Sequence, residues 1–214
     1  MVVIFGTIGY EPKSIIPTLT GHANVEKLIL FYTSKNEEVM KAVNEVHNYC
    51  KKMNLPYEDI RLEDPYDLIA TALRMKKALQ QHKDKDIIFN VTGSTKVISA
   101  AAIIVCIIDN IPAVYVNERT SKEEPLPLLN VKSKNIVTKK QLEILKIIMK
   151  NGGSIRPVEL SKKLGIKPAS ISLQLRNMAR RGLITIERDP DNMRSNIVRN
   201  AEHVPLLLYS EENE

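Results

Sequence analysis

Short apolar runs and longer amphipathic stretches alternate along the first 117 residues of the chain. Runs such as VVIF and DIIFNV are typical of buried strands, and the stretches between the runs have helical spacing or length. The expected strands are 2–5, 27–32, 57–62, 86–91 and 112–117, and the expected helices are 12–19, 36–54, 66–82 and 95–109. Strands that alternate with helices form a mostly parallel sheet covered on both faces. The sequence therefore predicts an α/β, Rossmann-like domain over residues 1–125.

Basic residues are concentrated in the C-terminal part of the chain. Residues 1–130 contain 15 Lys plus Arg against 16 Asp plus Glu, whereas residues 131–200 contain 16 against 5. Such an excess suits a phosphate backbone, because each Lys or Arg placed at a phosphate releases condensed counterions. Residues 119–135 have two prolines and no sustained period, which indicates a linker or an irregular edge strand. We place the linker itself at 126–137.

Three short helices followed by a hairpin are expected over residues 138–200. Thr138 and Gln141 form a capping-box pattern at the start of the first helix. Pro157 and Gly165 bound the second helix, and KPASISLQLRNMARRG is expected to form the third. The runs LITIER and SNIVRN then read as two strands on either side of DPDNMR. This order resembles the winged helix-turn-helix of bacterial and archaeal regulators, which implies double-stranded DNA as a partner.

The third helix of this group has one apolar face and one polar face. Ile171, Leu175 and Met178 share the face expected to pack in the core, so the opposite face is free to enter a major groove. Side chains on that face would read base edges, and arginines beyond it would hold phosphates. The candidate DNA-binding residues are Ser170, Ser172, Arg176, Asn177, Arg180, Arg181, Arg188 and Arg194.

Two loops rich in glycine and hydroxyl residues follow the first and fourth expected strands. GTIGYEPKS covers 6–14 and NVTGSTK covers 90–96, and loops at the carboxyl ends of parallel strands are where such sheets bind ligands. Backbone N–H groups there can point at an anion, and Lys96 adds a full charge. Neither GxxxxGK[ST] nor GxGxxG occurs, which removes support for ATP hydrolysis and ordinary dinucleotide chemistry. The four histidines have no metal-ligand spacing, so we expect no metal and no cofactor.

The NVTGSTK loop resembles the ligand motif of the CRISPR-associated Rossmann fold (CARF) domain. Asn90, Thr92 and Lys96 match its [Asn/Asp]-x-[Ser/Thr]-x-x-x-[Lys/Arg] pattern, GTIGY is similar to the family's first-strand loop, and the resemblance covers residues 1 to about 125. With the winged helix, the chain resembles archaeal CARF transcription regulators of CRISPR loci. The resemblance implies a homodimer that binds a cyclic oligoadenylate, most often cyclic tetra-adenylate, as its effector. The ligand-binding residues that it implies are Gly6, Thr7, Ile8, Gly9, Asn90, Thr92, Gly93, Ser94, Thr95 and Lys96.

Three functions remain open from the sequence. The first is a transcription regulator whose DNA affinity a cyclic oligoadenylate changes. The second is a ring nuclease, since some CARF proteins cleave the ring; Lys96, Ser94 or Thr95, and Thr7 would then be catalytic, although no general base is evident. The third is a regulator of another nucleotide or metabolite. Only two cysteines and no signal peptide or membrane span are evident, so a cytoplasmic protein is expected, and the role of the tail, 201–214, is left open.

Overall fold

The computed structural model describes residues 1–33, 36–127, 137–190 and 192–211. The chain separates into two compact units, residues 1–132 and residues 133–214. Most of the linker predicted at 126–137 lies outside the described residues. Each unit is described below by itself.

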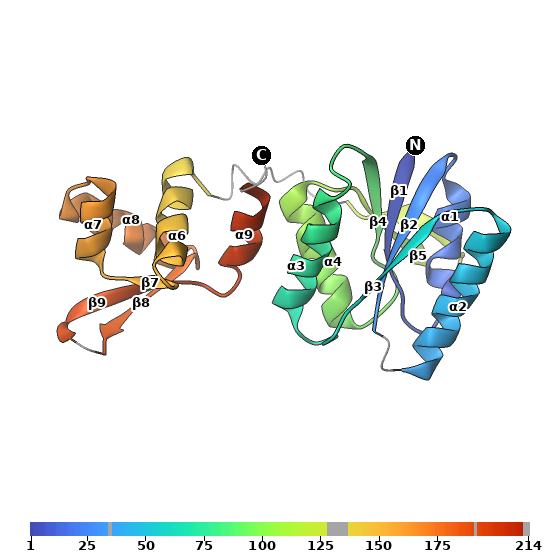
Figure 1. The fold of residues 1–214 in the computed structure, drawn as a ribbon, viewed down its shortest axis with the longest axis horizontal. Coiled ribbons are helices and arrows are strands. Elements are labelled where there is room, and N and C mark those ends of the chain that lie inside the picture. Colours follow the sequence, from blue (N-terminus) through green and yellow to red (C-terminus); the bar gives the residue numbers. More distant parts are fainter. Residues whose placement is uncertain (34–35, 128–136, 191, 212–214) are drawn as a thin grey trace. The chain divides into compact units, whose positions relative to one another are not determined.

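A six-stranded sheet forms the centre of the first unit (Figure 1). Its strands are β1 (Val2–Thr7), β2 (Val25–Tyr32), β3 (Tyr57–Arg61), β4 (Asp86–Asn90), β5 (Ala113–Asn117) and β6 (Lys122–Pro125). Their order is β3-β2-β1-β4-β5-β6, and all neighbours are parallel except β5 and β6. The predicted mostly parallel, Rossmann-like sheet is confirmed. The segment after Glu118, left open between linker and edge strand, contributes the antiparallel edge strand β6.

Helices cover both faces of this sheet. The elements are a 3-10 turn η1 (Pro12–Ser14), α1 (Ile16–Gly21), α2 (Glu37–Lys52), α3 (Leu68–Gln80) and α4 (Lys96–Asp109). Figure 1 shows α1 and α2 on one side of the strands and α3 and α4 on the other. On the second side, Phe5, Phe31 and Phe89 contact one another with ring centroids 5.7 to 6.0 Å apart. Burial of these rings fixes β1, β2 and β4 in register.

The order of the strands puts β1 and β4 next to each other at the centre of the sheet. The chain leaves β1 toward β2 on one side, and it leaves β4 toward β5 on the other. In a doubly wound sheet, the loops that diverge at such a point leave a crevice at the carboxyl ends of the strands. The last residue pair in this register is Gly6 with Asn90, so the two glycine-rich loops start side by side.

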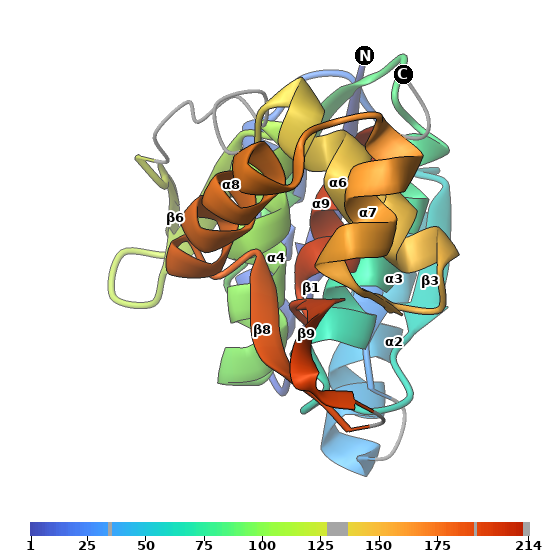
Figure 2. The same cartoon turned by 90° about the vertical axis from the view of Figure 1, so that its left-hand side faces the viewer.

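Among its described residues, the second unit combines four helices with a small antiparallel sheet. Its elements are α6 (Lys139–Lys150), β7 (Ser154–Ile155), α7 (Pro157–Leu164), α8 (Pro168–Arg180), β8 (Ile184–Asp189), β9 (Asn192–Asn200) and α9 (Val204–Glu211). The sheet order is β7-β9-β8. Figure 2 shows the β8–β9 hairpin extending beyond the helices, as a wing does. The three predicted helices and the hairpin are confirmed, and Thr138 and Gln141 form the expected capping box.

Two elements of this unit were not predicted from the sequence. Strand β7 has only two residues, Ser154 and Ile155, and a run that short has no readable period. Helix α9 lies in the tail, whose role the sequence leaves open. Its Val204 and Leu208 are buried in the same core as Ile144 of α6 and Leu175 of α8. The tail therefore completes the core of the second unit.

Candidate functional site

The loops after β1 and β4 touch through two glycines. A methyl group added at Gly9 would lie 2.9 Å from the backbone nitrogen of Ser94, and one added at Gly93 would lie 2.7 Å from the carbonyl oxygen of Thr7. Real side-chain carbons do not approach other atoms so closely. The two loops thus pack backbone against backbone, and glycine is required at both positions for that reason.

Asn90, the last residue of β4, connects the two loops through hydrogen bonds of its side chain. Its Nδ2 donates to the Ser14 carbonyl oxygen and to Thr18 Oγ1, both at 2.7 Å. Its Oδ1 accepts from the N–H of Thr92 at 2.9 Å and from Thr92 Oγ1 at 2.6 Å. The Thr92 hydroxyl in turn accepts from the N–H of Val116 at 2.7 Å. Asn90 is 0% exposed, so its side chain positions the segments around it.

Several backbone N–H groups of these loops are free to donate to a ligand. Ser94 has a φ of 108°, which is rare for a residue other than glycine and is typical of strained functional loops. Thr95 caps α4 by accepting from the N–H of Ile98 at 3.2 Å. Within the described residues, no hydrogen-bond acceptor contacts the N–H groups of Gly9, Tyr10, Gly93, Ser94 and Thr95. Unpaired donors beside a helix N-terminus favour an anion.

Two clefts open on either side of the contact between Gly9 and Ser94. The first has a volume of about 510 Å³ and is lined by Gly9, Tyr10, Glu11, Lys13, Ser14, Thr92, Gly93, Ser94, Val116, Asn117, Glu118 and Ser121. The second has a volume of about 410 Å³ and is lined by Gly9, Tyr10, Thr33, Asn36, Val39, Asp64, Pro65, Tyr66, Ser94 and Thr95. We call them the first cleft and the second cleft. Both lie at the carboxyl ends of the parallel strands.

The ligand-binding residues predicted from the sequence occupy three kinds of position. Gly9, Thr92, Gly93, Ser94 and Thr95 line the clefts. Gly6, Thr7, Ile8 and Asn90 are buried behind this surface, and Lys96 is exposed at the first turn of α4 without lining either cleft. Four residues were considered for ring cleavage, and of these Ser94 and Thr95 line a cleft whereas Lys96 and Thr7 do not. Ligand contact by any of these residues stays a prediction.

A third loop contributes to the first cleft, and sequence reasoning missed it. Asn117 is the last residue of β5, and Glu118 and Ser121 lie in the turn between β5 and β6. The position of this turn, at the carboxyl end of a parallel strand, was the signal that could have identified it. Asn117 is held in place because its Nδ2 donates to Glu124 Oε1 at 2.8 Å. Hydrogen bonds from Tyr115 and then from Asn117 stabilise the Glu124 carboxylate and lower its pKa below the usual value.

The second unit presents a polar helix face. Ile171, Leu175 and Met178 of α8 are buried, as the period of the sequence predicts. The exposed residues of the helix and the wing include the predicted DNA contacts Ser170, Ser172, Arg176, Asn177, Arg180, Arg181 and Arg188. The side chain of Arg194 lies outside the described part of the structure. Arg181 donates to Gln141 Oε1 at 3.1 Å, so it also ties α8 to the start of α6.

The base of the wing is fixed by a buried carboxylate. Asp189, at the end of β8, is 1% exposed. Its Oδ2 accepts from Arg156 Nε at 2.5 Å and from Ser195 Oγ at 3.2 Å. These contacts join the start of α7 to both strands of the hairpin. The wing is therefore held at a fixed angle to the helices of its own unit.

Other site chemistries have little support among the described residues. No group of three or more His, Cys, Asp and Glu side chains is arranged there to hold a metal ion. Cys50 and Cys106 are buried free thiols, and burial raises the pKa of both, to about 11 for Cys50. No helix among the described residues is long and apolar enough to cross a membrane.

Fold and site together define a two-part protein in which one unit has a ligand-sized cleft and the other is a winged helix with a basic face. A profile described as the Csa3 CRISPR-associated Rossmann-like domain matches residues 1–127, and a MarR family profile matches residues 137–195. The chain therefore belongs to the family with the Csa3 CRISPR-associated Rossmann-like domain, and its second unit is a MarR-type winged helix. The resemblance noted in the sequence, a CARF domain fused to a winged helix, is confirmed.

Two solved structures that are similar to the chain are described here, one over its whole length and one over part of it. Can2 from Sulfobacillus thermosulfidooxidans, in complex with cyclic tetra-adenylate, is 14% identical over 100% of this chain and 64% of its own, with a TM-score of 0.49. A mutant of MarR from E. coli, complexed with operator DNA, is 22% identical over 36% of this chain and 53% of its own, with a TM-score of 0.33. The chain thus spans about half the length of that regulator. No curated protein sequence matches the chain.

Proposed function

We propose that the chain is a DNA-binding transcription regulator of CRISPR-type loci and that cyclic tetra-adenylate is its effector. One observation carries the proposal: the loops after β1 and β4 meet at the switch point of the sheet and leave five backbone N–H groups without an acceptor within the described residues. A phosphate needs several convergent donors of this kind. The family of the first unit and the winged helix of the second supply the context.

The symmetry of the effector suits a dimer. Cyclic tetra-adenylate has a two-fold axis, so two copies of one cleft can offer it the same donors across a dimer axis. Each copy would contribute its own Gly9, Gly93 and Ser94 N–H groups. A dimer also suits the second unit, because winged-helix proteins read paired half-sites. Effector and DNA would then be coupled through the arrangement of the two copies, typically by about 1 to 3 kcal/mol.

The exposed face of α8 would be the DNA-reading surface. Arg176 and Asn177 carry the fork and amide groups that pair with base edges, and Ser172 precedes them by one helical turn. Arg188 lies on the wing, where a charge reaches the phosphate backbone. The core that holds this face, Ile171, Leu175 and Met178, is fully formed within the second unit. The reading face is thus presented on a rigid support.

A titration with defined rings tests the proposal. Purified protein is mixed with cyclic tri-, tetra- and hexa-adenylate, and binding is measured by calorimetry while chromatography follows the fate of the ring. We expect tight binding of the tetra-adenylate with the ring intact, and a changed affinity for promoter DNA in its presence. Linear products would instead support ring cleavage. The absence of binding to any ring would contradict the choice of effector and support another nucleotide or metabolite.

A further inference from the structure

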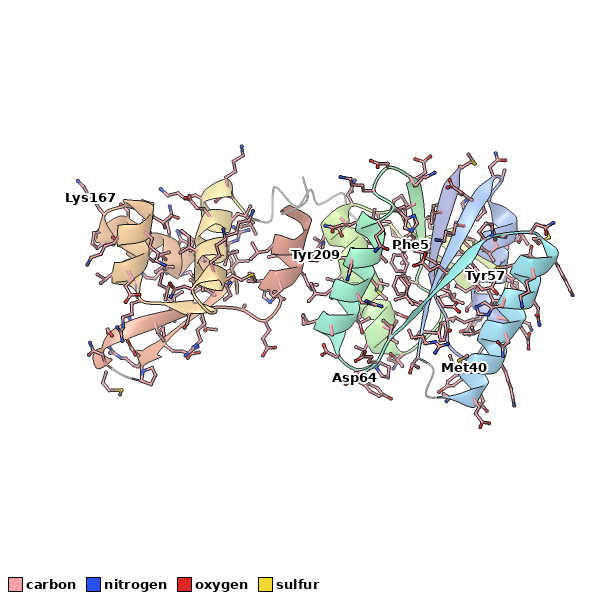
Figure 3. All side chains as sticks on the ribbon, viewed as in Figure 1. Phe5, Met40, Tyr57, Asp64, Lys167 and Tyr209 are labelled. Carbon is pink, nitrogen blue, oxygen red and sulfur yellow. The ribbon has the colours of Figure 1, made fainter. Side chains whose placement is uncertain are left out.

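We propose that the second cleft binds an adenine base of the effector and that Asp64 makes the cleft selective for adenine over bases with an oxygen at position 6. This inference rests on the proposed function, since it assumes an adenine nucleotide whose phosphate lies at the free N–H groups. Figure 3 labels Asp64 and Met40 of α2 toward the same end of the first unit, on opposite sides of the sheet. Of the ligand-binding residues predicted from the sequence, Gly9, Ser94 and Thr95 line this cleft.

The two clefts are continuous with the proposed phosphate site. Gly9, Tyr10 and Ser94 belong to the walls of both. A phosphate at the N–H groups of Gly9 and Ser94 would therefore have a cleft on each side. A nucleotide places its base one sugar away from its phosphate, so the base of a nucleotide bound there must enter one of the two. The two clefts differ in how many charged side chains line them: the first contains Glu11, Lys13 and Glu118. Among the described residues of the second, Asp64 is the one charged side chain, so the second cleft offers more uncharged surface to a base.

Aromatic rings flank the second cleft. Tyr10 is 64% exposed and Tyr66 is 74% exposed, which is high for side chains of this size. Both line the cleft, and they come from different loops, after β1 and after β3. An exposed ring at the rim of a cleft offers a surface on which a base can stack. The remaining wall is apolar at Val39 and Pro65.

Thr33 and Asp64 are the polar residues of the cleft on which the selectivity depends. Asn36 also lines it, but its Oδ1 accepts from the N–H of Glu38 at 2.8 Å and its Nδ2 donates to the Tyr10 hydroxyl at 3.4 Å. Thr33 is 9% exposed, and its Oγ1 is buried with no hydrogen-bond partner among the described residues. A buried hydroxyl without a partner is costly, so a ligand atom that bonds it would relieve that cost. Asp64 Oδ1 accepts from the N–H of Tyr66 at 2.9 Å, which fixes the carboxylate. The described residues provide no partner for its Oδ2.

The loop that carries Asp64 is held against the phosphate-side loop. Thr95 Oγ1 donates to the carbonyl oxygen of Pro65 at 3.1 Å while it caps α4. Asp67 caps α3 by accepting from the N–H of Ala70 at 2.9 Å. The position of Asp64 relative to the free N–H groups is therefore set by hydrogen bonds on both sides. A preorganised wall of this kind gives selectivity as well as affinity.

The chemistry of these groups matches adenine. Adenine has an amino donor at position 6 and ring-nitrogen acceptors, so a carboxylate can accept from the amino group while a hydroxyl donates to a ring nitrogen. Guanine and hypoxanthine have a carbonyl oxygen at position 6. That oxygen would face the Asp64 carboxylate as a second acceptor, and two acceptors without a proton between them repel. The second cleft should therefore reject such bases.

The experiment compares two rings and one isosteric variant. Full-length protein is titrated with cyclic tetra-adenylate and with cyclic tetra-inosinate, which carries hypoxanthine at all four positions. We expect the wild type to prefer the adenine ring by at least about tenfold, the range of one good discriminating hydrogen-bond pair. Asp64→Asn keeps the acceptor for the Tyr66 N–H but adds a donor. The variant should lose most of that preference.

Two further variants keep the outcome interpretable. Asp84→Asn makes the same change just before β4, at the opposite end of the strands, and should leave both affinities unchanged. Thr33→Val removes the unpartnered hydroxyl and keeps the side chain nearly the same shape. The affinity for cyclic tetra-adenylate should fall several-fold. If wild type binds the adenine ring and Asp64→Asn keeps the full preference, the base site is wrong and the effector stands. If wild type binds neither ring, the result contradicts the proposed function and, with it, the proposed base site.

Discussion

The cleft of the first unit and the exposed face of α8 in the second present their functional groups in opposite ways. Around the two clefts, the polar side chains of Asn90, Thr92 and Thr95 are engaged in hydrogen bonds within the protein, and several backbone N–H groups have no acceptor among the described residues. On α8 the backbone is bonded within the helix, and the side chains of Arg176 and Asn177 are exposed. The difference suggests two kinds of role: side chains such as Asn90 position the loops around the clefts, whereas side chains of α8 are themselves exposed to a partner.

The largest effect that the comparison predicts is at Asn90. Asn90→Ala would leave the Ser14 carbonyl, the Thr18 hydroxyl and the Thr92 N–H without their partner in a buried place. We expect a loss of about 3 kcal/mol in the free energy of unfolding, since each orphaned group costs about 1 to 3 kcal/mol, and a loss of effector binding. Urea unfolding followed by circular dichroism measures the first, and calorimetry the second.

A matched control for this variant is Asn44→Ala, an exposed position on α2. That change should shift the free energy of unfolding by less than about 0.5 kcal/mol. Equal stability of the two variants would contradict the positioning role of Asn90.

The second prediction concerns the contact between the two loops. Gly93→Ala would put a carbon 2.7 Å from the Thr7 carbonyl oxygen and 2.7 Å from Ser14 Oγ, so the loops must separate. We expect a loss of about 1 to 3 kcal/mol in stability and at least a tenfold weaker affinity for the effector. Gly21→Ala, with no atom within 4 Å of the added carbon, is the control and should be neutral or slightly stabilising. Normal effector binding by Gly93→Ala would mean that the loop contact does not shape the site.

The sequence predicted the fold well because the fold depends on periodic burial. Alternating runs identified five parallel strands, and the period of α8 identified Ile171, Leu175 and Met178 as its core side. Local chemistry also sufficed at helix ends, as Thr138 and Gln141 show. The sequence did not predict strand β7 or helix α9. Strand β7 is too short to show a period, and α9 has no distinct polar face.

The residues that line the clefts were predicted only in part. The two glycine-rich loops were identified, yet which residues face the cleft depends on how the loops pack against each other. Asn90 matches a ligand motif and is nevertheless fully buried, whereas Tyr66 and Asn117 match none and line the clefts. Five of the donors without an acceptor among the described residues are backbone N–H groups. Every residue except proline has such a group, so no residue pattern reveals which of them lack a partner.

The third prediction moves to the side-chain face of α8. Arg176→Ala should weaken binding to the operator by about 1 to 3 kcal/mol and relax sequence preference at one base pair, with no change in the free energy of unfolding. Fluorescence anisotropy with a set of singly substituted operators measures both. Arg74→Ala, which removes an exposed arginine from α3, is the control and should bind DNA as wild type does. A uniform loss across all operators would place Arg176 on the phosphate backbone and not on a base edge.

The smallest expected effect is at Arg188 on the wing. This exposed side chain can reach a phosphate but has no base to read from β8, so Arg188→Ala should weaken every operator by the same modest factor. The more decisive quantity is the salt dependence of the affinity. Each lost phosphate contact reduces the slope of log K against log salt concentration by about 1. A dimer loses two such contacts at once, so a change of about 2 would also report that both wings touch DNA, whereas an unchanged slope would remove the wing from the interface.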